Sequence, residues 1–271
     1  MSQDPGKEVH SLLIASYRPP SVVSSRVNRL GRVRCLAAGL ANRVESLRFL
    51  SIGGIADNSH SKSRMIQASH ISKIVLPPHA DPILKGQPRG LWGVGNAEIL
   101  RRPLLALISA RQIDRDLELM SLELIQRLAA SRNISFISGW HSQLEQECLR
   151  ILLTKQASLV FCTSKALDRF KPSAELSQLV AQNNGLLLTH CTPNAKRISR
   201  EASIRRNELV ITLAAALLVL SAPEGSASLN FARAALKAQK PVFTLDHHLN
   251  RKLLASSGSV ATFESICAAV R

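Results

Sequence analysis

The fold is decided by residues 199–245, which read SREASIRRNELVITLAAALLVLSAPEGSASLNFARAALKAQKPVFTL. The apolar run from Leu209 to Leu220 is too long for one strand. We divide it into the end of a helix, 207–214, and a buried strand, 216–220. A continuous apolar strand bounded by small residues is typical of a parallel sheet that is covered on both faces.

A turn of small residues, 224–228, follows this strand and leads into a predicted helix, 229–239, and a short final strand, 241–245. Small residues let the backbone turn tightly, and the first amides of the following helix can hold an anion. Cationic and polar residues stand just upstream of the apolar run: Lys196, Arg197, Arg200, Arg205, Arg206 and Asn207. The stretch therefore predicts a binding site for phosphates.

The chain before this stretch alternates between apolar strands and amphipathic helices. Strands are predicted at 104–109, 134–137, 158–163 and 186–189, and helices at 114–130, 144–153 and 175–182. This alternation predicts an α/β fold with a doubly wound, mostly parallel sheet. Ligands of such sheets bind at the carboxyl ends of the strands, which here carry residues 109–111, 138–142, 163–165 and 225–228.

The composition points to a polyanionic partner. The formal net charge is +16 and the pI is near 10.5, a balance that favours nucleic acid or another polyanion. The five cysteines show no C-x-x-C spacing, so we expect reduced thiols, no metal site and no cofactor. No apolar run is long enough to predict a membrane span.

The sequence divides into three regions. Residues 1–80 are rich in Ser and Arg and poor in acids. They are interpreted as a basic extension that orders on a partner, as a small helical domain, or as an organelle-type (plastid-type) transit segment. Residues 86–250 form the main domain, and 251–271 a helical tail. The expected location is the cytoplasm, or an organelle if the transit interpretation holds.

Several single residues have competing interpretations. Arg111 either holds a phosphate or pairs with Asp114, and Ser226 either caps a helix or also contacts a phosphate. His247 and His248 follow the last strand beside Asp246, but the sequence indicates no third metal ligand. Glu145 and Glu147 are expected on a solvated helix face. Three aromatic residues are expected to pack in the core: Phe161, Phe170 and Phe231.

Short motifs along 86–248 resemble the DNA-processing protein A family (DprA, also called Smf), which has an extended Rossmann-like domain. Its "V-V-S-G" corresponds to Phe136–Gly139, its "R-R-N" helix to Arg205–Asn207 and its "S-G-(S/T)" turn to Gly225–Ser226. Further collinear pieces lie at Pro88–Gly95, Ile108–Arg111, Leu167–Pro172, Gly185–Thr189 and Val242–Leu245. Several glycines of the family pattern are replaced here, for example by Ser109, Gln143 and Ser164.

The resemblance implies a protein that binds single-stranded DNA and loads a RecA-type recombinase, without enzymatic activity. The nucleic-acid-binding candidates are then Arg111, Lys196, Arg197, Arg200, Arg205, Arg206, Asn207, Gly225 and Ser226. Two alternatives stay open. One is a degenerate family member that serves as a structural subunit of a larger nucleoprotein or protein complex. The other is a nucleotide-sensing or nucleotide-hydrolysing enzyme. A homodimer is compatible with the first two.

Overall fold

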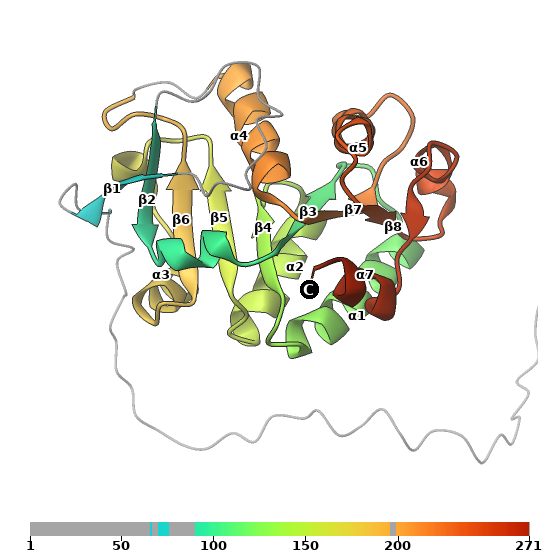
Figure 1. Cartoon of the computed structure of the whole chain (residues 1–271), viewed down its shortest axis with the longest axis horizontal. Helices are drawn as coiled ribbons and strands as arrows, with labels where there is room; N and C mark the ends of the chain where they lie inside the picture. The colour runs from blue at the N-terminus through green and yellow to red at the C-terminus, as the bar shows by residue number, and fades with distance from the viewer. Residues whose placement is uncertain (1–65, 67–69, 76–89, 196–198, 271) are drawn as a thin grey trace, which may run out of the picture. The chain divides into compact units, whose positions relative to one another are not determined.

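The computed structural model describes residues 66, 70–75, 90–195 and 199–270, all within the unit Asn58–Arg271 (Figure 1). The alternatives for the basic N-terminal region therefore concern residues outside the described part. Among the described residues, none of the helices has the length and apolar character that crossing a bilayer requires.

The described residues form a sheet of nine strands in the order β1-β2-β6-β5-β4-β3-β7-β8-β9. All pairs from β6 across to β9 are parallel, whereas β2 runs antiparallel to both β1 and β6. The strands are β1 (Ser72–Ile74), β2 (Leu91–Gly95), β3 (Leu104–Ser109), β4 (Ser135–Ser138), β5 (Leu159–Thr163), β6 (Gly185–Thr189), β7 (Ala216–Ser221), β8 (Val242–Thr244) and β9 (Ser259–Val260). The predicted mostly parallel sheet is confirmed.

Helices cover both faces of the sheet (Figure 1). One face packs against α1 (Arg115–Ala130), α2 (Gln143–Thr154), α3 (Ala174–Ala181) and α7 (Phe263–Ala269). The other face packs against α4 (Arg200–Leu213), α5 (Ala227–Lys237), α6 (Arg251–Leu254) and the short 3-10 helix η2 (Ala97–Arg101). Two further 3-10 turns are η3 (Leu167–Arg169) and η4 (His248–Asn250). This two-sided cover makes the sheet doubly wound, as predicted.

The alternation of side chains along β3 shows why the strand sequences are apolar throughout. Leu105 and Leu107 enter the core with α1 and α2, while Leu104, Ala106 and Ile108 enter the core with α4 and α5. Successive residues of a strand point to opposite faces, so a strand covered on both sides needs apolar side chains at every position.

The long apolar run divides as the sequence predicted. Helix α4 ends at Leu213 and β7 begins at Ala216. The helix begins earlier than the apolar run, at Arg200, because the Ser199 hydroxyl caps it by accepting a hydrogen bond from the Ala202 amide at 3.0 Å. The extra turns carry the arginines that were predicted to bind phosphate.

Strand β3 lies at the point where the strand order reverses. Its neighbours are β4 on one side and β7 on the other, and the chain proceeds outward in opposite directions from them. Loops that leave the carboxyl ends of such strands diverge and leave a crevice between them. The topology therefore fixes the position of a site above β3.

Candidate functional site

A cavity of about 520 Å³ opens at this crevice. Three loops line it: the β3–α1 loop, the β4–α2 loop and the β7–α5 turn, and one face of α4 closes it. These loops come from three of the four strand ends that the sequence singled out. Residues 163–165, at the end of β5, are absent from the lining of this cavity.

The cavity brings together five of the nine predicted binding residues: Arg111, Arg206, Asn207, Gly225 and Ser226. Arg200 and Arg205 lie exposed on α4, outside the cavity lining, and Arg205 forms an ion pair with Glu201. Lys196 and Arg197 lie outside the described residues. The structure thus divides the predicted binding residues of α4 into an inner set that lines the cavity, Arg206 and Asn207, and an outer set on the surface, Arg200 and Arg205.

Arg206 belongs to the inner set and is almost completely buried, with 7% of its surface exposed. Burial lowers the pKa of its guanidinium, and the nearby Glu145 carboxylate counteracts that shift. Its Nε donates to Asn207 Oδ1 at 3.0 Å. A Cβ atom at Gly139 would lie 2.6 Å from Arg206 Cζ, so the glycine in the S-G sequence makes room for the guanidinium.

Glu145 does not lie on a solvated helix face, and that prediction was wrong. The residue is 6% exposed, and its carboxylate accepts hydrogen bonds from the amides of Ser109 at 2.9 Å and His141 at 2.6 Å. A longer bond of 3.4 Å comes from the Ser142 amide and completes a capping box at the start of α2. The Glu145 carboxylate therefore accepts hydrogen bonds from backbone amides of both the β3–α1 loop and the β4–α2 loop.

Burial raises the pKa of Glu145, and the hydrogen bonds from His141, Ser109 and Ser142 oppose that rise, with a smaller contribution from Arg206. A carboxylate that receives several backbone N–H donors is favoured in its charged form. The opposite charges of Glu145 and Arg206 thus each favour the charged form of the other. Glu147, on the same helix, is partly exposed and pairs with Arg150, as expected of a surface side chain.

The β7–α5 turn combines a glycine in a left-handed conformation with a serine cap at the start of α5. Gly225 has a φ of +77°, a left-handed conformation that favours glycine, and no heavy atom beyond the adjacent residues lies within 4 Å of where its Cβ would be. The Ser226 hydroxyl accepts from the Leu229 amide at 3.1 Å, which confirms its predicted role as the cap of α5. The turn presents the amino-terminal end of α5 to the cavity.

The positive charge in the cavity lining comes from Arg111 and Arg206. Arg111 is exposed at its rim and forms no ion pair with any described residue, so the predicted alternative of pairing with Asp114 is wrong. The pKa of His141 is lowered by burial first, and then by Arg206 and Arg111. Two arginines from different elements therefore act on one point of the cavity.

The acidic residues of the lining are already paired. Glu145 is hydrogen-bonded internally, and Glu224 forms an ion pair with Lys252 at 3.3 Å. Serine hydroxyls in the lining are used locally: Ser109 Oγ donates to the Ala110 carbonyl, and Ser138 Oγ accepts from the Trp140 amide. The arrangement offers cationic and amide donors for holding an anion.

The aromatic predictions hold in part. Phe161 and Phe170 pack against the first core with ring centroids 5.1 Å apart. Phe231 packs against the second core but also lines the cavity, half-buried. One aromatic side chain is therefore available at the site, contrary to a purely structural role for all three.

Comparison with known proteins gives a consistent result. The model of the DNA recombination-mediator protein A family matches residues 75–268. No curated protein matches the chain. Among solved structures, DNA processing protein A from Helicobacter pylori, described for its single-stranded DNA binding mode, is 25% identical, with a TM-score of 0.61. The match covers 73% of this chain and 94% of that one.

DNA processing protein A (DprA) from Streptococcus pneumoniae shares the fold, with 18% identity and a TM-score of 0.61. This match covers 72% of this chain and 71% of that one. The family match extends the resemblance seen in the motifs at both ends. On this match, the chain belongs to the DNA recombination-mediator protein A family.

Proposed function

We propose that this protein binds single-stranded DNA and acts in DNA processing and recombination, by binding and not by catalysis. The observation that supports this most directly is the convergence of Arg111 and Arg206 on one cavity, where both act on His141. It occurs in a member of a family whose solved Helicobacter pylori structure is described for single-stranded DNA binding.

The proposed contacts are to the phosphate backbone. Arg111 at the rim and the amino-terminal end of α5 bind one phosphate, and the exposed Arg200 and Arg205 on α4 extend the cationic surface to neighbouring phosphates. The buried Arg206 adds positive charge to the wall of the cavity. Such contacts give strong salt dependence and little sequence preference. Phe231 is the candidate for stacking against a base.

The contacts of Glu145 affect which groups in the loops are free to bind phosphate. Because its carboxylate already accepts the Ser109 and His141 amides, we propose that these two loops do not bind phosphate through those amides. Side chains, above all Arg111, then carry more of the binding energy than backbone groups do.

The test is fluorescence anisotropy with labelled oligo-dT and the full chain at two salt concentrations. Arg111→Ala should weaken binding and reduce the salt slope by about one phosphate contact, roughly 0.7 units of log K per log salt. Arg132→Ala is the matched control. It removes the same charge from an exposed residue in the loop between α1 and β4, at the amino edge of the sheet. Equal losses for both variants, or no binding at low salt, would overturn the proposal.

Loading of a RecA-type recombinase is the finer part of the proposal and rests on family resemblance. It predicts that the protein accelerates recombinase filament assembly on single-stranded DNA, and that Arg111→Ala slows this. A homodimer is the proposed functional form.

A second candidate, a structural subunit of a larger complex, is favoured by one observation, the internal occupation of the loop amides by Glu145. It predicts copurification in a large assembly together with failure to bind oligo-dT.

A further inference from the structure

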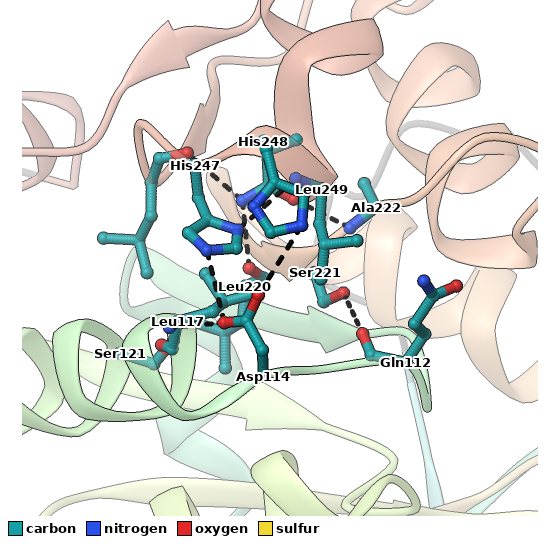
Figure 2. Close-up of polar contacts among 12 residues, drawn as sticks. Gln112, Asp114, Leu117, Ser121, Leu220, Ser221, Ala222, His247, His248 and Leu249 are labelled. Carbon is teal, nitrogen blue, oxygen red and sulfur yellow. Dashed lines mark hydrogen bonds and ion pairs between the residues drawn. The ribbon is translucent and has the colours of Figure 1, made fainter. Parts of the chain in front are cut away.

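Three side chains that can ligate a metal ion lie close together (Figure 2). None of them lines the cavity described above. Asp114 precedes α1 as its cap, and His247 and His248 follow β8. One potential ligand atom from each lies within 4.8 Å of the others. The sequence placed the two histidines together, whereas the third ligand comes from a segment more than a hundred residues earlier.

The distances suit a transition-metal ion. His247 Nε2 lies 3.2 Å from Asp114 Oδ1, and His248 Nε2 lies 3.6 Å from Asp114 Oδ2. Zinc bonds of about 2.0–2.1 Å in a tetrahedral arrangement place neighbouring ligand atoms roughly 3.3 Å apart. We propose that Asp114, His247 and His248 bind one divalent transition-metal ion, with Zn²⁺ as the ion that best fits the ligand set, and leave a fourth position open to water.

The surroundings hold these ligands in place without the ion. Asp114 Oδ1 accepts the Leu117 amide at 3.0 Å, which fixes the carboxylate at the start of α1. At the end of η4, the buried Asn250 donates to the carbonyls of Leu220 and Leu245, both at 3.1 Å, and accepts from the Ala222 amide at 2.8 Å. This frame anchors the loop that carries both histidines to the end of β7.

Charge and exposure also suit an ion. His247 is mostly buried, with 10% of its side chain exposed, while Asp114 is 40% and His248 58% exposed. The site is thus open on one side for entry of an ion. One carboxylate and two neutral imidazoles leave a single positive charge on a divalent ion, and the open side gives water access to it.

Metal binding requires a change of tautomer at His247. The Leu249 amide donates to His247 Nδ1 at 3.3 Å, so in the metal-free chain the proton sits on Nε2 and points to Asp114. Coordination through Nε2 moves this proton to Nδ1 and breaks the bond from Leu249, which is long for an N–H donor. This step leaves the Leu249 amide without its imidazole acceptor.

The ion would tie the β3–α1 loop to the loop after β8. Arg111 stands three residues before Asp114 in the same loop, and Ser221 Oγ donates to the Gln112 carbonyl at 2.6 Å between them (Figure 2). The metal therefore holds the segment that presents Arg111 to the cavity, and occupancy of the metal site should restrict that segment.

The experiment is a Zn²⁺ titration by calorimetry of the full chain, with its thiols alkylated so that cysteines do not compete. Co²⁺ absorption then reports the ligand type. Asp114→Asn is the key variant, because Asn caps a helix as well as Asp but is a poor metal ligand. His248→Ala removes an exposed ligand, and His70→Ala removes an exposed histidine elsewhere.

The expected result is one ion per chain, a Co²⁺ spectrum of nitrogen and oxygen ligands, and affinity losses above about 100-fold in Asp114→Asn and His248→Ala only. The His70→Ala variant should bind as the unmodified chain does. Absence of saturable binding, or binding that persists in both site variants, would overturn the proposal. The histidines and Asp114 would then form only a hydrogen-bonded cluster.

Discussion

Replacing Glu145 with Gln tests whether an ionised carboxylate holds the loops of the cavity together. The amide keeps the size of the side chain but turns one acceptor oxygen into a donor. The less costly orientation keeps the oxygen toward His141 and Ser142 and places the NH₂ group against the Ser109 amide, where the carboxylate oxygen now lies at 2.9 Å.

The expected loss follows from these contacts. One charge-assisted hydrogen bond, worth about 1.5–3 kcal/mol, disappears, and the partly buried Ser109 amide is left facing another donor. Arg206 also loses its counter-charge. Relief from burying a carboxylate, the burial that raises the pKa of Glu145, offsets part of this loss. The net effect is a fall of about 2–3 kcal/mol in the free energy of unfolding.

The assay is urea unfolding of Glu145→Gln beside Glu147→Gln, which changes a surface carboxylate on the same helix. The control should lose less than about 0.5–1 kcal/mol. If Glu145→Gln also loses less than about 0.5 kcal/mol, the carboxyl is protonated in the folded protein and the reasoning is refuted. Oligo-dT affinity provides a second readout. It should rise in the folded variant, because a negative charge leaves the cavity.

Three further predictions concern the same domain. Gly139→Ala should push the Arg206 guanidinium aside, destabilise the fold by roughly 1–3 kcal/mol and weaken oligo-dT binding, measured by urea unfolding and anisotropy. Asn250→Ala should cost about 3–5 kcal/mol in the free energy of unfolding, because three buried backbone groups lose their partner; a loss below about 1 kcal/mol would contradict this role. The pKa of His190 is lowered from its ordinary 6.5 by burial and then by Arg205 and Arg206. Its contribution to stability is therefore present above pH 6.5 and lost as the pH falls through the lowered pKa, because the unfolded chain binds the proton more readily. His190→Gln should flatten that part of the stability–pH curve, and an unchanged curve would refute the assignment.

Most of the sheet was predictable because its strands are buried on both sides. The run from Leu209 to Leu220 needed only one division, and the structure places the break within one residue of the prediction. β1 and β9 escaped prediction because they are short and largely exposed, so no apolar pattern marks them. Pairing with a neighbouring strand, and not local sequence, makes them strands.

The site was predictable where topology decides it. Arg111 and Gly225 were predictable because they follow the carboxyl ends of predicted parallel strands and fall on motifs of the resembled family, and the structure brings both to one cavity. The basic segment was predicted as one unit, although neighbouring helical residues point about 100° apart. Arg206 therefore faces the cavity while Arg205 faces solvent.

The roles of two acidic residues could not be predicted from the sequence, because they depend on tertiary contacts. Glu145 looked like a surface carboxylate, although the Ser142-x-x-Glu145 capping-box pattern was a signal that its side chain turns back to the backbone. Asp114 was predicted only as the start of a helix and a possible partner of Arg111, and nothing local indicates that the loop after β8 brings two histidines to it.

The borders of the nine-stranded sheet have a consequence for self-association. β1 offers three residues and β9 only two, and most of their side chains are exposed. Within the described residues, a border this brief gives another molecule few free amides and carbonyls with which to continue the sheet. Any dimer of this protein should therefore join through helices or loops, and concentrated solutions should resist edge-to-edge polymerisation despite the width of the sheet.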